Sequence, residues 1–281
     1  MAADLSARSE YALARACRVA HTLQQPLEAL HVVDKDLNHA FRQQTVSWAK
    51  QNLEPLTKKI ADEYGVACSA VVAQGRPRQT LIERANDPKT SLLVFGVHDG
   101  AKDEPRAFAK TTAGQALAGS IAPALLVHEK PDQDYRNVVV GIDFTLSSRA
   151  AIRQALTMAP EAKIHLVHAY HAPFIGLSAS PGLAEEIAYQ HKLQFDKFVA
   201  DEMAILAEQA EGMGAIADNL HRVIEAGAPD QVLRRVCDRV NADLVVLATH
   251  GRGAVSRAIW GSVAASLLDK PPCDVLVIKP F

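Results

Sequence analysis

The stretch GAPDQVLRRVCDRVNADLVVLA occupies residues 227–248, and it has a counterpart, GRPRQTLIERANDPKTSLLVFG, at residues 75–96. Each copy begins with a glycine, continues through a segment with helical spacing, and ends in a compact apolar run of the kind that forms a buried strand. Self-similarity between segments that recur along a chain indicates a repeated architecture. The sequence therefore predicts a duplicated fold.

The rest of the chain extends this repeat. The other matching segments, given as pairs, are residues 4–20 and 143–159, 29–34 and 163–169, and 122–128 and 272–279. The second pair places His31 opposite His165. Between the copies lies EKPDQDYR, residues 129–136, which is polar, contains a proline and has no apolar periodicity, as is typical of a linker. We expect domains at residues 1–130 and 137–281.

Length and composition agree with two domains. The chain has 281 residues, of which 48% are hydrophobic, and each half of about 140 residues is close to the commonest domain size. Lys and Arg total 30 against 32 Asp and Glu, and the formal net charge is -2. Without a basic run, the chain lacks the electrostatic signature of nucleic-acid binding. We expect no nucleic-acid partner.

The first residues, MAADLSARSEYALARA, carry charges and contain no apolar stretch long enough for a signal peptide or a membrane span. We therefore expect a cytoplasmic protein. The cysteines lie far apart in the sequence and form no CxxC pair, which argues against a disulfide framework and against a thiolate zinc site. They are Cys17, Cys68, Cys237 and Cys273.

Short apolar runs alternate with helical segments, which favours a mostly parallel sheet with helices on both faces. In the long segment LAEEIAYQHKLQFDKFVADEMAILAEQ, five apolar residues recur near a 3.6-residue period and predict a core-facing helix; they are Leu183, Ile187, Phe198, Met203 and Leu206. The matching helix of the first copy, roughly residues 40–63, contains Pro55, which should kink or split it. Doubly wound sheets bind ligands at the carboxyl ends of their strands.

At such a strand end, after residue 248, the chain reads THGRGAVSRAIWGSVAASLL. Gly251 is followed by nine residues and then by Gly261 and Ser262 at the start of an apolar helical segment. Glycines let backbone N–H groups approach an anion, and a helix N-terminus provides unpaired donors. Ser262 can donate to a phosphate or cap the helix. Glycines at a strand exit and a helix start are also ordinary turn residues, so the motif alone leaves both interpretations open.

The duplicated pattern, over essentially the whole chain, resembles the universal stress protein family in its tandem form. The resemblance implies a Rossmann-like, five-stranded parallel sheet of order 3-2-1-4-5 in each half. It also implies ATP binding, with or without Mg²⁺, through a motif of Gly, two residues, Gly, nine residues and Gly-Ser or Gly-Thr. Residues 248–262 are similar to that motif, with Ala248 in place of the first glycine. Ala248 should weaken binding only if that position needs a positive φ or touches the nucleotide.

The resemblance also implies roles for several further single residues. The first strand of the second copy ends in Gly141, Ile142 and Asp143, and the acidic residue should lie beside the adenosine. Asp143 also suits the role of a helix N-cap. The resemblance places the backbone of Leu166 at the adenine edge. His250 and Val263 match positions near the phosphates and the ribose, although a histidine in a turn is often merely solvated.

The first copy departs from the motif. Gly96 matches its first position, but Asp99 replaces the next glycine, residues 102–106 add charged groups, and Thr111-Thr112 replaces Gly-Ser. Acidic groups beside a triphosphate oppose its binding, so we expect no ATP in this copy. Its first strand is reduced to residues 1–3 ahead of Asp4. Either the chain begins several residues late or the copy has only a stub of its central strand.

The last strand of each copy is an edge strand in the expected order, and exposed edges invite pairing. The resemblance implies dimerisation through this strand, so we expect the two halves to form an intramolecular pseudo-dimer. The resulting hypothesis is a cytoplasmic stress-response regulator that binds ATP or a related adenine nucleotide in its C-terminal domain only and has unknown protein partners.

We expect no enzyme beyond very slow ATP hydrolysis, because the chain has neither a G-x-S-x-G elbow nor a Walker sequence. His165, His168 and His171 recur at intervals of three, which on a strand does not bring them together on one metal ion. The alternative function is an interaction module or a carrier of a small, lipid-like ligand that uses the cleft between the domains and holds no nucleotide.

Overall fold

The computed structural model describes residues 1–97, 107–171, 181–209, 219–249 and 261–279. The N-terminal half contains α1 (Ala7–Leu23), β1 (Leu27–Asp34), α2 (His39–Tyr64), β2 (Cys68–Gly75), α3 (Pro77–Ala85), β3 (Leu93–Gly96), the 3₁₀ turn η1 (Phe108–Lys110), α4 (Thr112–Gly119) and β4 (Ala124–Val127). The C-terminal half contains β5 (Asn137–Gly141), α5 (Leu146–Met158), β6 (Lys163–Tyr170), α6 (Pro181–Gln209), β7 (Leu220–Ala226), α7 (Pro229–Val240), β8 (Leu244–Ala248), α8 (Ser262–Asp269) and β9 (Asp274–Ile278). The predicted α/β class is confirmed.

The C-terminal half has a complete parallel sheet. Its strands lie in the order β7-β6-β5-β8-β9, which is 3-2-1-4-5 when they are numbered within the half. This order confirms the predicted one. It also brings the carboxyl ends of β5 and β8 side by side, at the point where the strand order reverses and where sheets of this type form a crevice.

The N-terminal half has β1 paired with β2 and β3 paired with β4, all parallel, with a gap where the first strand belongs. The stub Met1–Ala3 lies in this gap. Ala2 forms a parallel bridge with Leu30 and donates its N–H to the carbonyl of Val94 at 2.9 Å, and Ala3 N–H donates to Leu30 O at 2.8 Å. Residues 1–3 thus pair with both neighbouring strands, as a stub of the expected first strand would.

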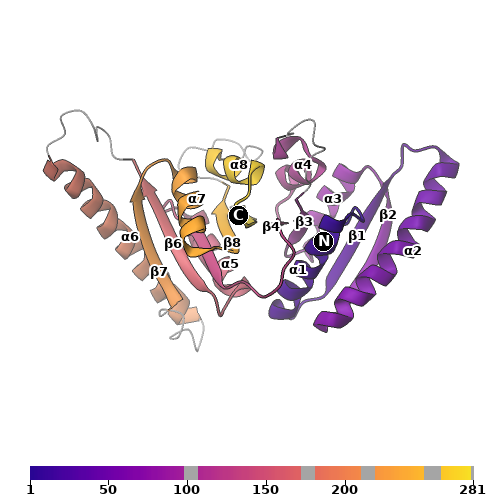
Figure 1. Ribbon diagram of the computed structural model, residues 1–281, viewed down its shortest axis with the longest axis horizontal. Helices are drawn as coiled ribbons and strands as arrows, with labels where there is room; N and C mark the ends of the chain where they lie inside the picture. Colours follow the sequence, from indigo (N-terminus) through magenta and orange to yellow (C-terminus); the bar gives the residue numbers. More distant parts are fainter. Residues whose placement is uncertain (98–106, 172–180, 210–218, 250–260, 280–281) are drawn as a thin grey trace.

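The two halves meet along their last strands. Strand β4 pairs antiparallel with β9, so that seven strands form one continuous sheet. Leu125 lies opposite Leu276 at the middle of this pairing, and both side chains are fully buried. In Figure 1 the two halves spread to either side of this shared region.

Two polar contacts also tie a helix end of one half to the other half. Lys279, just after β9, donates from Nζ to the carbonyl of Ala118 near the end of α4, at 3.1 Å. Asp269, the last residue of α8, accepts a hydrogen bond from the N–H of Phe108 at 2.7 Å. Helices α4 and α8 are thus each held at one end by the opposite half.

The helices pack on the two faces of the sheets in two groups. Leu13 of α1 and Ile152 of α5 belong to one buried cluster, together with residues of α2 and α6. Leu117 of α4 and Leu267 of α8 belong to the other, together with residues of α3 and α7. Full burial of one such side chain stabilises the fold by about 1.5–3 kcal/mol. Because both clusters draw on both halves, the apolar core continues across the β4–β9 pairing.

The two long helices differ in part from expectation. Helix α2 runs unbroken through Pro55, so the predicted split does not occur. In α6 the predicted stripe is wrong at its beginning, because Leu183 is 49% exposed. The buried face starts further along the helix, at the fully buried Phe195, and includes Phe198. An apolar period locates a face of a helix, but it does not show how much of the helix extends past the sheet.

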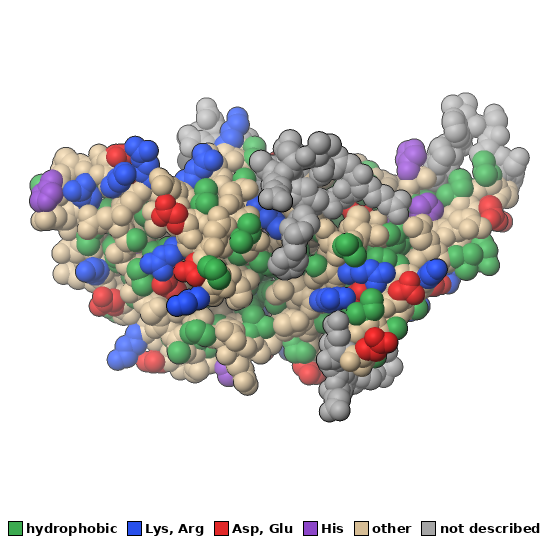
Figure 2. Space-filling view, turned by 180° about the vertical axis from the view of Figure 1, so that it is seen from behind, with side chains coloured by type: hydrophobic (Ala, Val, Ile, Leu, Met, Phe, Trp, Pro, Cys, Tyr) green, Lys and Arg blue, Asp and Glu red, His purple; other side chains and the backbone are tan. Residues whose placement is uncertain are grey.

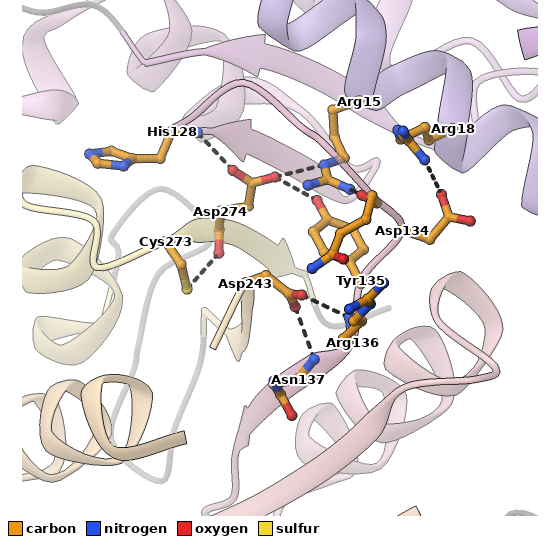
Figure 3. A network of polar contacts seen from close by, with 11 residues as sticks. Arg15, Arg18, His128, Asp134, Tyr135, Arg136, Asn137, Asp243, Cys273 and Asp274 are labelled. Carbon is orange, nitrogen blue, oxygen red and sulfur yellow. Dashed lines mark hydrogen bonds and ion pairs between the residues drawn. The ribbon is translucent and has the colours of Figure 1, made fainter. Parts of the chain in front are cut away.

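The linker is anchored by a buried polar network (Figure 3). Asp274, at the start of β9, accepts from Arg15 Nε of α1 at 3.1 Å, from the hydroxyl of Tyr135 at 2.8 Å and from the N–H of His128 at 2.8 Å. The guanidinium of Arg15 also lies over the ring of Tyr135, 4.0 Å from its centroid. Burial raises the pKa of Asp274, while the charge of Arg15 and these hydrogen bonds oppose that shift. One network therefore joins the first half, the linker and the second half.

The surface carries mixed charge. On the face shown in Figure 2, basic and acidic side chains are interspersed rather than gathered into one basic patch. Among the described residues, no helix has the length and apolar character needed to cross a lipid bilayer.

We expect the free energy of unfolding to decrease as the pH falls below about 6.5, because of His165. His165 and His221 lie opposite each other on β6 and β7, with their rings stacked 5.0 Å apart. Burial lowers the pKa of His165, and the charge of His221 lowers it further. At a pH below the pKa that His165 has in the unfolded chain, His165 binds a proton more readily in the unfolded chain than in the folded one. Protonation therefore favours unfolding.

Urea midpoints at about pH 7.5 and about pH 5.5 should differ less for His165→Gln than for the unchanged chain. Equal differences in the two proteins would contradict this assignment.

Candidate functional site

The C-terminal half contains a pocket of about 600 Å³ at the carboxyl ends of its central strands. Predicted residues that line it are Gly141, Ile142, Asp143, Ala248, Gly261, Ser262 and Val263. Leu166 does not line it: the Leu166 side chain is fully buried in the core on the other face of the sheet, and Val167 lines the pocket instead. Neighbouring residues on a strand point to opposite faces. His250 and Gly251 lie outside the described residues.

Asp143 is the polar anchor at one side of the pocket. Its Oδ1 accepts from the N–H of Thr145 at 3.1 Å, from the hydroxyl of Thr145 at 2.6 Å and from the hydroxyl of Ser148. The N-cap of α5 is Thr145, which accepts from Ser148 N–H at 3.3 Å, so Asp143 positions the cap rather than being the cap itself. Within the described part of the chain, the second oxygen, Oδ2, accepts no hydrogen bond and remains available to a ligand.

The start of helix α8 also lines the pocket. Its N-cap is Gly261, and no side chain among the described residues caps the helix. The N–H of Gly261 donates to the carbonyl of Thr249 at 3.1 Å, which joins the end of β8 to the start of the helix. The first N–H groups of an α-helix have no acceptor within the helix, and the helix dipole favours an anion there. Ser262 and Val263 carry such groups on the pocket wall.

Ala248 causes no backbone strain at its position. It is the last residue of β8, it pairs with Ile278, and it is not among the residues with positive φ. Its methyl group lines the pocket. Ala248 was expected to weaken binding if its position needed a positive φ or touched the nucleotide. The structure shows no positive φ there, so only contact with the ligand could weaken binding.

Further lining residues were not identified from the sequence. His168 is buried, with Nδ1 2.9 Å from the carbonyl of Ile142 and Nε2 3.0 Å from Nδ1 of His191. The ring of Phe144 lies 4.2 Å from that of His168, centroid to centroid. Phe144 has a φ of 63°, which follows from the tight turn that Asp143 holds. The sequence did contain a signal for this turn, because a serine or threonine stands two and five residues after the aspartate in both copies.

The register of the repeat at the histidines needs correction. His31 Nδ1 lies 2.8 Å from the carbonyl of Ala3, as His168 Nδ1 does from that of Ile142. The bridge between Ala2 and Leu30 corresponds to the pairing of Gly141 with Val167. His31 is therefore the counterpart of His168, and the predicted match with His165 is wrong by three residues. Runs of apolar residues that are buried on both faces align almost equally well in neighbouring registers.

The N-terminal half has a smaller pocket, of about 350 Å³, at the equivalent place. Here the N-terminus of α4, the helix that follows β3, is capped, because the hydroxyl of Thr111 accepts a hydrogen bond from the N–H of Gly114 at 3.0 Å. The start of α4 is therefore occupied by a side chain of its own segment, whereas no described side chain occupies the start of α8 in the C-terminal half. Asp99 and residues 102–106, on which the predicted repulsion of a triphosphate depended, lie outside the described residues.

No group of three or more potential metal ligands occurs among the described residues. His165 and His168 differ in surroundings: His165 faces His221, whereas His168 faces the pocket. His171 is exposed beyond the end of β6.

Comparison with known proteins agrees with this architecture. The solved structure of a universal stress protein from Archaeoglobus fulgidus has a TM-score of 0.69 and 17% identity, with 99% of this chain and 96% of that chain covered. A putative universal stress protein from Pseudomonas aeruginosa has a TM-score of 0.66 and 20% identity, with 100% of this chain and 91% of that chain covered.

Relatives by sequence carry the same family name. Universal stress protein E of Photorhabdus laumondii is 25% identical over 221 residues, which is 75% of this chain and 68% of that protein. Universal stress protein E of Salmonella typhi is 23% identical over 268 residues, or 90% of this chain and 81% of that protein. The model of the universal stress protein family matches residues 1–129 and again residues 134–279. The chain belongs to the universal stress protein family and contains two copies of its domain.

Proposed function

We propose that this chain is a cytoplasmic stress-response regulator that binds ATP or a related adenine nucleotide in the pocket of its C-terminal half. The observation that carries the proposal is the N-terminus of α8, which no described side chain caps and which lines a pocket of about 600 Å³ together with Asp143. A nucleotide needs both a cradle for anions and an acceptor for sugar or base hydrogens. The residues that line this pocket offer both.

Each part of the pocket has a role in this proposal. The N–H groups at the start of α8 and the Ser262 hydroxyl hold phosphate oxygens. Asp143 Oδ2 accepts a hydrogen bond from a ribose hydroxyl or from the adenine amino group. Val167 and Leu247 provide apolar surface for the base. The described lining residues offer no cluster of carboxylates, so Mg²⁺ would arrive on the phosphates of the nucleotide rather than in a protein cage.

The proposed role is binding rather than rapid hydrolysis. Three described side chains in the pocket could act as a base, namely Asp143, His168 and His191. Asp143 Oδ1 holds the α5 cap and its Oδ2 is assigned to the ribose or the base, both nitrogens of His168 are hydrogen-bonded, and His191 Nδ1 pairs with His168. A general base must reach the proton it removes. We therefore expect any hydrolysis to be very slow.

The N-terminal half, in this proposal, serves as a paired scaffold. Its last strand completes the edge of the C-terminal sheet, and the network of Arg15, Tyr135 and Asp274 fixes the linker between the halves. An exposed sheet edge is prone to association with other chains. Pairing of β4 with β9 covers that edge within one chain, in the manner of a pseudo-dimer.

Calorimetry with ATP and Mg²⁺ tests the proposal. We expect saturable binding with one ATP per chain. The absence of heat at millimolar ATP would contradict the nucleotide function and would favour the alternative of a small-ligand carrier.

A further inference from the structure

At one end, the N-terminal pocket is lined by the counterparts of residues that line the C-terminal pocket. Asp4 holds the place of Asp143, His31 that of His168, and the two lie on the matching elements of the two halves. The N-terminal pocket also has a wall that the other lacks, because Leu268 and Asp269 of α8 reach it from the opposite half. It is therefore a cavity that both halves build.

The geometry of the shared end is nearly identical. Asp4 Oδ1 accepts from the N–H of Ser6 at 3.0 Å and from its hydroxyl at 2.6 Å, which repeats the bonds of Asp143 to its cap. The following residue has a φ of 62° at Leu5 and of 63° at Phe144. His31 Nδ1 lies 2.8 Å from a carbonyl, so Nδ1 carries the hydrogen and Nε2 of the neutral ring is an acceptor. The part of the site that would hold a sugar and base is present in both halves.

The end that would hold phosphate is closed. The Thr111 hydroxyl accepts from Gly114 N–H at 3.0 Å and donates to the carbonyl of Phe108 at 2.7 Å, so the first turn of α4 is capped by its own chain. A Cβ on Gly114 would lie 2.0 Å from that carbonyl, which shows how closely the η1 turn crosses the helix start. The carboxylate of Asp269 adds negative charge to the wall. Arg8 also lines this pocket, so the charge on its wall is mixed, but an anion meets fewer helix N–H donors here than at α8.

We propose that the N-terminal pocket binds an unphosphorylated nucleoside. Its volume of about 350 Å³ is near the lower end of small-molecule sites, large enough for an uncharged ligand and much smaller than the C-terminal pocket. Leu30 and Phe95 provide apolar walls for the base. His31 Nε2, which has no partner among the described residues, accepts a hydrogen bond from an amino group or hydroxyl. The two halves then recognise the same class of molecule with and without its phosphates.

This inference rests on the proposed nucleotide function, because the C-terminal pocket is its template. The test is equilibrium dialysis of radiolabelled adenosine against the full chain saturated with ATP. We expect one adenosine to bind per chain. Thr112→Trp and, separately, Val32→Trp should fill the N-terminal pocket and weaken this binding at least about tenfold, which corresponds to ~1.4 kcal/mol. Thr112 is exposed and Val32 is half-buried, so neither change disrupts a fully buried position.

The matched control is Ser262→Trp, at the position equivalent to Thr112. It should weaken ATP binding measured by calorimetry and leave the adenosine site intact, whereas Thr112→Trp should leave ATP binding unchanged. Absence of adenosine from the ATP-saturated chain would overturn the inference, and so would adenosine binding that neither N-terminal tryptophan weakens. If the chain binds no ATP but still binds adenosine in a way that both N-terminal tryptophans weaken, the inference stands and the proposed nucleotide function fails.

Discussion

Arg15→Ala is expected to lower the free energy of unfolding by about 3–5 kcal/mol, the usual cost of removing one partner from a buried ion pair. The side chains of Arg15 and Asp274 are only 7% and 5% exposed. Without Arg15, the Asp274 carboxylate keeps its hydrogen bonds from Tyr135 and His128 but loses its counter-charge. The loss also removes the cation from the face of Tyr135. Because the network joins both halves to the linker, the whole chain should become less stable.

The measurement is urea denaturation followed by circular dichroism, with the transition midpoint as the readout. Arg18→Ala is the matched control. Arg18 lies one helical turn along α1 and pairs with Asp134 at 3.0 Å, but the side chain of Asp134 is 73% exposed. A pair of this kind contributes about 0–1 kcal/mol. Equal midpoints for the two variants would show that the buried network does not hold the halves together.

Gly261→Asp is expected to weaken ATP binding by about 100-fold or more, or ~2.7 kcal/mol. The substitution places a carboxylate at the N-cap of α8, where it would accept the N–H groups that we propose for the phosphates. It also adds like charge beside them. Two charges 4 Å apart near a protein surface interact by about 4 kcal/mol. The added Cβ would lie 3.2 Å from the carbonyl of Thr249, so this backbone must move by a few tenths of an ångström to accept the side chain.

Thr111→Asp is the control for this change. It introduces the same carboxylate at the equivalent N-cap of α4, which is already capped, and aspartate is as good an N-cap as threonine or better. We expect ATP binding by calorimetry to be unchanged in this variant. Unaltered ATP affinity in a folded Gly261→Asp chain would contradict the assignment of the phosphate cradle to α8.

The candidate site was predictable where the chemistry is local. Gly141, Asp143 and Ser262 lie at a strand end or begin a helix, and local position together with the family resemblance pointed to them as residues of the pocket wall. Leu166 was expected to act through its backbone, and its side chain lies on the other face of the sheet, so Val167 is the residue of this strand whose side chain lines the pocket. His191 was missed for another reason. It comes from α6 and reaches the pocket only through the packing of that helix against β6, which no spacing in the sequence encodes.

The sequence by itself determined the duplication and the α/β class, because both are recorded in the order of apolar runs along the chain, whereas the strand order followed from the family resemblance. Only the tertiary structure decided that α4 is capped while α8 is open, that His31 corresponds to His168, and that Arg15, Tyr135 and Asp274 form one buried network. These features depend on contacts between residues far apart in sequence, and such contacts are selected by packing and by the need to pair buried polar groups rather than by local pattern.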